Sequence, residues 1–359
     1  MKVNNTLRVL VAAGAAVALT MMAMEASAQG SPRVKWKMQS AFGSTLPHLG
    51  TSGVLFEKNI SAATDGRLEI KFYEPGALVP ALECFDAASK GSVDACWTTP
   101  GYHTGKIPAA AFFTTMPFGP GFGEFMAWKR FGGGNTLRNE IYAPYDLLGF
   151  DGAAIGPETS GWFKQEIKSL DQLKGMKMRF FGLGARVMQK LGVSTQLLAA
   201  ADIYPALERG VIDATEFSMP SIDQKLGFYQ IAKNNYFPGW HQQISVNEFL
   251  VNKKAFEALP KHYKMIVELG LGESVLNTYA ETEWRNPVAM NENAEKYGVT
   301  NRRWTDAQLA TFEKAWIEVL AEEAAKDPIF KKVADSYLAF RKSYKGWGDA
   351  QFLKPSYLN

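Results

Sequence analysis

Cysteine and histidine are scarce in this chain, which has two cysteines and four histidines among 359 residues. They are scattered and do not have the spacing of a zinc finger. Beyond the first 28 residues no segment contains 18 unbroken apolar residues, so the sequence predicts no later membrane-spanning helix. The formal net charge is only +3, and so mild a balance argues against nucleic acid as a partner.

The first 28 residues are typical of a signal peptide. Lys2 and Arg8 supply the positive start, residues 9–24 are almost unbroken apolar, and positions 26–28 read Ala-Ser-Ala, a small-x-small cleavage site. We therefore expect cleavage after Ala28 and export to the periplasm. No cysteine follows the site, so we expect no lipid anchor.

The two cysteines leave one question open at this point. An oxidising compartment allows a disulfide between Cys84 and Cys96. Cys84 falls in an expected helix and Cys96 at the end of the strand that follows, so the sequence does not settle whether the pair has the geometry of a bridge.

Strand and helix patterns alternate along the first two thirds of the chain. Hydrophobic periodicity and turn residues predict strands at 34–40, 68–74, 93–98, 147–155, 212–217 and 245–252 and helices at 49–64 and 79–90. The β-α-β-α-β order at the start predicts a mostly parallel, three-layer α/β sheet.

The remaining segments are expected to be loops or helices. Residues 236–243 are interpreted as a loop and residues 344–359 as an irregular tail. From residue 254 the pattern is helical, with long helices near 261–296 and 305–326 and with breaks at Pro287, Gly298 and Pro328.

These elements predict an α/β fold of two lobes, a clamshell like that of periplasmic binding proteins, with interleaved domains and a long C-terminal helical region. We expect lobe I to comprise 29–150 and 248–280, lobe II to comprise 151–247, and helices in 281–359 to span both lobes. A cleft between two domains is where a small ligand usually sits, and its closure would be a hinge motion.

The segment 174–184, KGMKMRFFGLG, carries the strongest functional signal. It predicts a short strand that ends near Arg179, two glycines, and a helix from residue 185. A guanidinium offers a planar fork of donors that suits a ligand carboxylate, and a helix N-terminus favours an anion. The alternative is that Arg179 simply pairs with a neighbouring glutamate.

Other candidates lie on the same rim, because ligands of α/β sheets bind beyond the carboxyl ends of the strands. Thr98 and Tyr102 are expected to face a ligand, although packing within a loop is the alternative for each. An apolar wall would favour a hydrophobic or aromatic monocarboxylate, and six aromatic residues are expected on or near the rim: Trp97, Tyr102, Phe180, Phe181, Phe217 and Trp240. Each could instead be an ordinary core residue, and His241 is interpreted as structural.

Catalytic motifs are missing from the sequence. It contains no G-x-S-x-G elbow, no H-E-x-x-H and no S-x-x-K with its partner motifs, so an exported hydrolase is the less favoured alternative and we expect no enzyme. An ABC-type receptor is also disfavoured, by the long helical C-terminal region and by the Arg179 segment.

Several segments in combination resemble the extracytoplasmic solute receptors of TRAP transporters, the DctP-type receptors, over about residues 34–259. Within them the chain is most similar to the branch of 2-oxo-acid, lactate and chloroaromatic-acid receptors. The segments are GRLEIKFYEPGALVPALECFDAASKGSVDACWTT, AAFFTTMPFGPGFGEFMAW, GWFKQEIKSLDQLKGMKMRFFGLG, ALERGVIDATEF and YFPGWHQ with EFLVNKKAFEALP.

The resemblance implies a set of site residues. Arg179 matches the arginine that holds the ligand carboxylate, and in this branch a cation bridges ligand and protein. The positions of its ligands are Glu158, Glu216, the backbone carbonyl of Phe217, and Gln242. Glu158 stands where the family pattern has glutamine and Phe217 where it has tryptophan. Glu158, Phe217 and Gln242 are thus expected near both cation and substrate.

Two glutamates that converge in a cleft repel unless a cation or a proton lies between them. Oxygen ligands suit Na⁺ or Ca²⁺, and the extra carboxylate of Glu158 favours Ca²⁺. Two alternatives stay open: one glutamate is neutral and hydrogen-bonds the ligand directly, or Glu158 turns to solvent.

The resemblance also implies partners. The receptor would capture a small organic monocarboxylate and deliver it to the membrane permease subunits of the TRAP transporter. The branch includes receptors that dimerise by exchanging C-terminal helices, and the helical region 261–325 permits such a homodimer without establishing it.

Overall fold

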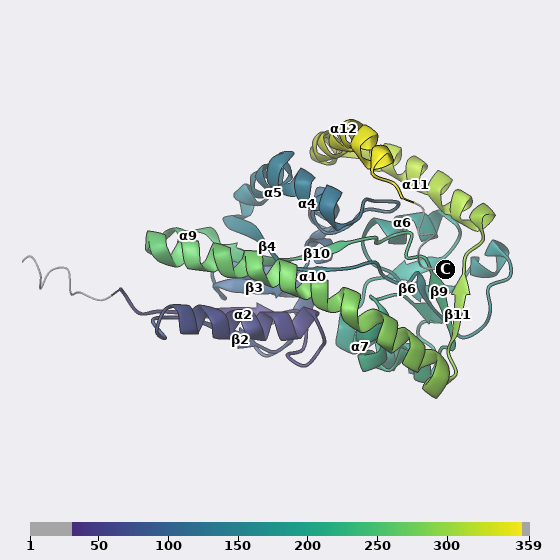
Figure 1. Ribbon diagram of the computed structural model, residues 1–359, viewed down its shortest axis with the longest axis horizontal. Helices are drawn as coiled ribbons and strands as arrows, with labels where there is room; N and C mark the ends of the chain where they lie inside the picture. Colours follow the sequence, from purple (N-terminus) through teal and green to yellow (C-terminus); the bar gives the residue numbers. More distant parts are fainter. Residues whose placement is uncertain (1–30, 354–359) are drawn as a thin grey trace, which may run out of the picture.

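The computed structural model describes residues 31–353, so the expected signal peptide and its cleavage site lie outside the described residues. The chain is mixed α/β and contains two sheets, which lie side by side along the long axis of the molecule (Figure 1). Each sheet forms the centre of one lobe. Within residues 31–353 no helix is both long and apolar enough to cross a membrane.

The first sheet has the strand order β2-β1-β3-β10-β4. Its strands are β1 (Val34–Ser40), β2 (Leu68–Tyr73), β3 (Ala95–Thr98), β4 (Leu147–Ile155) and β10 (Ser245–Asn252). β1 is parallel to β2 and β3, whereas β10 is antiparallel to β3 and β4. The expected mostly parallel sheet is therefore correct, and three of its strands have the bounds that the sequence predicts.

The second sheet has the strand order β11-β9-β5-β8-β6-β7. Its strands are β5 (Gly161–Phe163), β6 (Lys177–Arg179), β7 (Ser194–Gln196), β8 (Ala214–Thr215), β9 (Asn234–Phe237) and β11 (Thr300–Arg303). The expected loop at 236–243 is wrong at its start, because β9 continues to Phe237. β11 pairs with β9, so the C-terminal region contributes a strand to this sheet.

Eleven α-helices surround the sheets in the described part of the chain. They are α2 (Leu49–Ala63), α3 (Cys84–Ser89), α4 (Phe122–Phe131), α5 (Gly134–Tyr142), α6 (Gly182–Lys190), α7 (Ala200–Glu208), α8 (Pro220–Leu226), α9 (Lys253–Glu257), α10 (Lys261–Tyr297), α11 (Asp306–Lys326) and α12 (Pro328–Ala350). Short 3₁₀ turns complete them at Ala81–Glu83, Pro100–His103, Pro108–Phe113, Ala143–Tyr145, Leu170–Leu173 and Phe228–Gln230. The tail expected to be irregular is helical up to Ala350.

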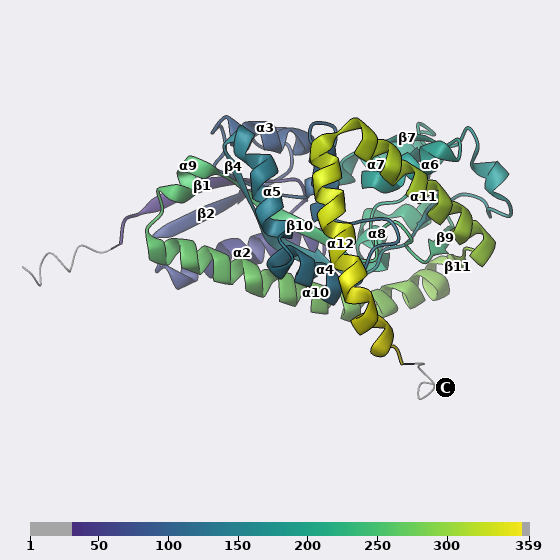
Figure 2. The same cartoon turned by 90° about the horizontal axis from the view of Figure 1, so that it is seen from above.

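Helix α10 runs across both lobes (Figure 1). It continues through Pro287, so the expected break there is wrong. Packing against β4, α2 and α8 outweighs the hydrogen bond that the proline removes. Helices α11 and α12 also connect the lobes, since α11 packs on α6 of one lobe and α12 lies over α4 and α5 of the other (Figure 2).

A buried histidine joins the two lobes beside α10. His48 lies just before α2, and its Nε2 is 2.9 Å from the hydroxyl oxygen of Ser221 on α8. Its Nδ1 is 3.1 Å from a carboxylate oxygen of Glu281 on α10. The imidazole therefore contacts the first lobe, the second lobe and the helix that they share.

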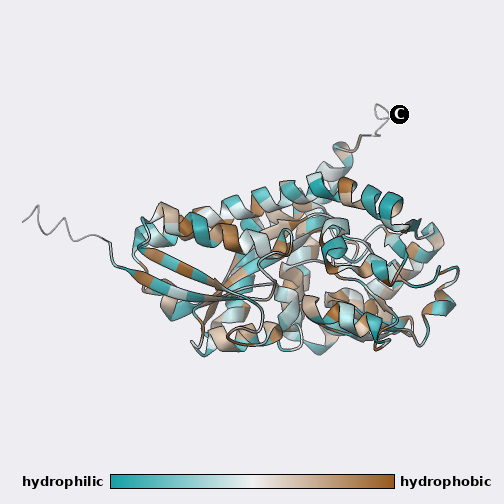
Figure 3. Cartoon of the chain, turned by 90° about the horizontal axis from the view of Figure 1, so that it is seen from below, coloured by the Kyte–Doolittle hydropathy of each residue, from teal (hydrophilic) through white to brown (hydrophobic). Residues whose placement is uncertain are grey.

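The chain crosses between the sheets at two further places, between Ile155 and Gly161 and between Phe237 and Ser245. The residue boundaries of the lobes given above remain a prediction. β1, which follows the grey N-terminal trace, alternates hydrophobic and hydrophilic residues in Figure 3, as expected of a half-buried strand. Cys84 and Cys96 form a disulfide, which answers the question that the sequence leaves open.

Candidate functional site

Arg179 lies at the end of β6, and its side chain is only 1% exposed. Its Nη1 donates to the backbone carbonyl and to the Oε1 of Glu216, both at 2.8 Å, and its Nε donates to the carbonyl of Leu198 at 3.2 Å. Nη2 takes part in none of these bonds. The pairing with a glutamate that the sequence offers as an alternative is therefore present, within the expected site.

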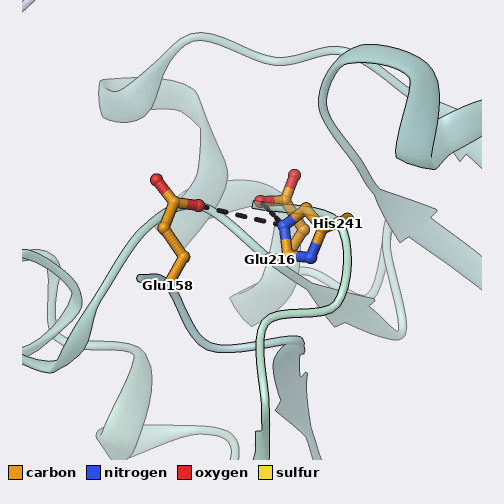
Figure 4. Close-up of side chains that lie close together, drawn as sticks. All are labelled: Glu158, Glu216 and His241. Carbon is orange, nitrogen blue, oxygen red and sulfur yellow. Dashed lines mark ion pairs between the residues drawn. The ribbon is translucent and has the colours of Figure 1, made fainter. Parts of the chain in front are cut away.

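Three ionisable groups converge beside this arginine (Figure 4). The Nε2 of His241 lies 3.4 Å from the Oε2 of Glu216 and 3.8 Å from the Oε2 of Glu158. All three side chains are buried, and one ligand atom from each lies within 4.8 Å of the others. The alternative in which Glu158 turns to solvent is wrong in this structure.

The surroundings shift the pKa values of the two carboxyl groups in opposite directions. Burial, followed by the nearby charges of Glu216 and Asp223, raises the pKa of Glu158 well above its usual value. Burial also acts to raise the pKa of Glu216, but the Arg179 guanidinium and then His241 hold that pKa below its usual value. One proton on Glu158 thus relieves the repulsion when no cation is bound.

The donor atoms of this cluster fit an oxygen-seeking cation. Within residues 31–353 the Oε2 atoms of Glu158 and Glu216 and the Oε1 of Gln242 are buried without a hydrogen-bond partner. Unpaired buried oxygens are costly unless a ligand satisfies them. Two carboxylates and an amide oxygen suit Na⁺ or Ca²⁺, and His241 is a fourth group in reach.

The local backbone holds these residues together. Glu158 follows β4 and Gln242 precedes β10, so both lie in the segments that cross between the lobes. The backbone N–H of Glu158 donates to the carbonyl of Gln242 at 3.1 Å. A Cβ on Gly239 would come within 2.2 Å of the Glu158 carbonyl oxygen, so this close approach requires glycine. Ser218 donates to the Oε1 of Glu158 at 3.2 Å.

A small cavity of about 20 Å³ lies between the lobes next to this cluster. Five of the six residues predicted to bind the substrate line it, namely Tyr102, Glu158, Arg179, Phe217 and Gln242. Thr98 does not, and its neighbour Thr99 does. Successive side chains of a strand point to opposite faces, so a prediction that is one residue out in register selects the wrong threonine.

Three of the six aromatic residues expected on or near the rim line this cavity. Tyr102, Phe181 and Phe217 line the cavity, whereas Trp97, Phe180 and Trp240 are buried in the core clusters and do not. The guanidinium carbon of Arg179 lies 5.0 Å from the ring centre of Phe217. Apolar and aromatic surface therefore surrounds the charged groups, and a bound anion would be well shielded from water.

Tyr102 and Phe181 come from different lobes and pack edge to face, with 5.8 Å between their ring centres. A Cβ on Gly101 would lie 2.0 Å from the tip of the Phe181 ring. The lobes thus approach each other at a residue that has no side chain.

Sequence reasoning missed two kinds of residue. His241 is interpreted as structural above, yet it lies between the two glutamates, and its only signal is its position beside Gln242. Ser245 and Asn247 also line the cavity. They lie on a strand whose other residues are mostly apolar, so no pattern distinguishes them.

A model of the bacterial extracellular solute-binding proteins of family 7, DctP, matches residues 42–327. The chain belongs to this family. A monocarboxylate 2-oxoacid-binding periplasmic protein of Nostoc is 35% identical over 347 residues, which are 96% of this chain and 94% of the relative. The resemblance inferred from the sequence is therefore confirmed.

Solved structures give the same fold. A TRAP transporter solute-binding protein of Bordetella bronchiseptica, with copurified calcium and picolinate in one site, has a TM-score of 0.87 and 33% identity over 89% of this chain and 95% of that chain. One from Pseudoalteromonas atlantica, with bound sodium and pyruvate, has a TM-score of 0.85 and 32% identity over 89% of this chain and 97% of that chain. The two-lobed α/β fold is confirmed by both.

Proposed function

We propose that this protein is the solute receptor of a TRAP transporter and captures an organic monocarboxylate between its lobes. The observation that carries the proposal is the cavity between the lobes that Arg179 and Glu158 line, with Glu216 and His241 beside it. The guanidinium supplies charge recognition of a carboxylate. The two glutamates supply carboxylate ligands for a cation that bridges the bound acid and the protein.

The ligands named for the two solved relatives narrow the substrate class. Pyruvate and picolinate both carry a lone pair on the atom next to the carboxylate-bearing carbon, an oxygen in one and a ring nitrogen in the other. A cation can be chelated by that atom together with one carboxylate oxygen. We therefore propose 2-oxo acids first, and 2-hydroxy and aromatic acids with the same arrangement next.

The cation is proposed to be Ca²⁺ or Na⁺, held by Glu158, Glu216, Gln242 and the backbone carbonyl of Phe217. Two carboxylates favour the divalent ion, because each attracts it about twice as strongly as a monovalent ion at equal distance. His241 would orient Glu216 from the side.

Other parts of the proposal rest on the family. The receptor would act in the periplasm after cleavage at Ala28, would release its ligand unchanged, and would deliver it to the membrane permease subunits. A homodimer through exchange of C-terminal helices from 261–325 is part of the same proposal. The family match favours this receptor over the alternatives of a hydrolase and an ABC-type receptor.

A ligand screen tests the proposal. We expect pyruvate and other 2-oxo, 2-hydroxy or aromatic monocarboxylates to raise the melting temperature, and to raise it more with Ca²⁺ than with a chelator, because a ligand that binds only the folded state stabilises it. An NMR spectrum of the recovered ligand should show it unaltered. No stabilisation by any of these acids, or turnover of one, would contradict the proposal.

Variants of Arg179 test its assignment as the residue that binds the ligand carboxylate. Arg179→Ala should weaken binding by about 2–5 kcal/mol, because one side of a buried charge pair is lost. Arg179→Lys, which keeps the charge but not the planar fork, should fall between alanine and wild type. Arg186→Ala removes an exposed arginine one turn into α6 and should leave the affinity unchanged.

A further inference from the structure

The charged groups of the site are unevenly divided between the lobes. Arg179, Glu216 and the backbone carbonyl of Phe217, which is a proposed cation ligand, belong to the second sheet or follow directly from it. A ligand held only by them would bind the open and closed forms equally well. Such a ligand could not drive closure, because a ligand shifts an equilibrium only by its differential affinity for the two states. The first lobe must therefore offer a contact of its own.

The polar side chains that line the cavity from the lobe of the first sheet are Thr99, Tyr102, Ser245 and Asn247. Ser245 and Asn247 count with this lobe because β10 belongs to the first sheet, although the predicted boundary at 247 assigns them to lobe II. Two of these four side chains are already bonded to one residue. The hydroxyl oxygen of Thr114 lies 3.0 Å from that of Thr99 and 3.1 Å from that of Ser245. These hydroxyls satisfy one another, which leaves Tyr102 and Asn247.

Asn247 is 3% exposed, and within residues 31–353 its Nδ2 is buried without a hydrogen-bond partner. An unmade hydrogen bond of this kind costs free energy in the closed form. A ligand oxygen in the cavity would accept this hydrogen bond. The same amide therefore disfavours closure without a ligand and favours closure around one.

The backbone holds Asn247 rigidly in this place. β10 lies between β3 and β4, and opposite Asn247 the register with β4 shifts, from Ala153 at Asn247 to Asp151 at Glu248. Such bulges re-aim side chains beside functional sites.

The next residue, Glu248, is itself locked on the other face of β10. Its Oε1 lies 3.0 Å from the Nε2 of His103, and the hydroxyl of Tyr142 points at both carboxylate oxygens, at 3.2 Å from Oε1 and 3.1 Å from Oε2. His103 directly follows Tyr102, so this buried network holds the sequence neighbours of both remaining first-lobe groups.

We propose that Asn247 is the first-lobe hydrogen-bond donor to an oxygen of the bound acid, and that this bond couples ligand binding to closure of the cleft. The inference rests on the proposed function. It adds a residue to the binding site and gives that residue a role that Arg179, which lies on the second lobe, cannot fill.

The test compares wild type with Asn247→Ala and with the nearly isosteric Asn247→Leu, each checked for folding by its melting temperature. Pyruvate binding in Ca²⁺ is measured by calorimetry, release by stopped flow, and closure by small-angle X-ray scattering. We expect pyruvate affinity to fall at least tenfold in both variants, mostly through faster release. At saturating pyruvate the decrease in radius of gyration should be smaller than in wild type.

Two further measurements show whether the loss of pyruvate affinity is specific to the hydrogen bond of Asn247. Ca²⁺ affinity without pyruvate should stay within about twofold of wild type, since the cation ligands are untouched. Asn293→Ala is the matched control, because Asn293 is also a buried asparagine whose Nδ2 has no partner in the described part of the chain, but it does not line the cavity. It should leave pyruvate affinity unchanged.

Two results would overturn the inference: variants that bind pyruvate like wild type, or variants that bind it weakly but close as fully at saturation. Both leave the proposed function intact. If wild type binds none of the acids in the screen, the proposed function fails instead.

Discussion

Replacing Glu158 by glutamine separates the effect of a proton at the site from that of a cation. Glutamine has nearly the shape of a protonated glutamate but cannot ionise. Burial and the neighbouring Glu216 raise the pKa of Glu158, so the wild-type protein without a cation loses stability as the pH rises through that raised pKa. Glu158→Gln should not lose this part of its stability.

The magnitude follows from the geometry. The ligand atoms of the cluster lie within 4.8 Å of one another. Two unit charges at this separation repel by about 3.5 kcal/mol at an effective dielectric constant of 20, and burial adds to this cost. Above the unfolded-state pKa the wild type should fall behind the variant by up to about 1.4 kcal/mol for each pH unit, until the raised pKa is reached.

Urea unfolding in a chelator at pH 5 and pH 8 measures the difference. We expect the two proteins to be similar at pH 5 and the glutamine variant to be more stable at pH 8. With Ca²⁺ the order should reverse, and calorimetry should show at least tenfold weaker Ca²⁺ binding by the variant, which corresponds to about 1.4 kcal/mol. Glu268→Gln, at an exposed position of α10, is the control and should change neither quantity.

Equal stability of wild type and Glu158→Gln at both pH values would refute the electrostatic part of this reasoning. Unchanged Ca²⁺ affinity would refute the assignment of Glu158 as a cation ligand.

Two other perturbations test closure and the link between the lobes. Gly101→Ala should lower ligand affinity severalfold in calorimetry, because its Cβ would lie 2.0 Å from the Phe181 ring, whereas Gly105→Ala, with open space around its Cβ, should have no effect. Burial lowers the pKa of His48 below 6.5, although Glu281 opposes the shift. The stability that neutral His48 contributes is therefore present above pH 6.5 and lost as the pH falls through the lowered pKa. Urea unfolding should show that the wild type loses more stability at low pH than His48→Gln does. An equal loss in the variant would contradict the assignment of the effect to His48. His262→Gln, at an exposed position, is the control and should behave like wild type.

The strands of the first sheet could be predicted from the sequence because their hydrophobic patterns are strong. β1, β4 and β10 have the predicted bounds. β9 and β11 were not predicted, since NNYF and TNRR are polar and become strands only by pairing with each other and with β5. Pro287 predicts a break in α10, but tertiary contacts along that helix override the local preference.

Local sequence patterns also fail to predict those residues of the site whose roles depend on tertiary contacts. Arg179 and the two glutamates could be predicted because they are charged residues in segments with a family pattern. The third member of the cluster, His241, and the lining residue Asn247 could not, because their roles depend on neighbours that are distant in sequence. Glu158 lies 83 residues before His241, and the fold alone brings them within 3.8 Å.

The most direct test of the account is a crystal structure with Ca²⁺ and the acid that raises the melting temperature most. We predict that one carboxylate oxygen of the acid lies within hydrogen-bond distance of the Arg179 guanidinium and that the cation lies between Glu158 and Glu216. An acid bound elsewhere, with Arg179 still bonded only to Glu216 and the Leu198 carbonyl, would contradict this assignment.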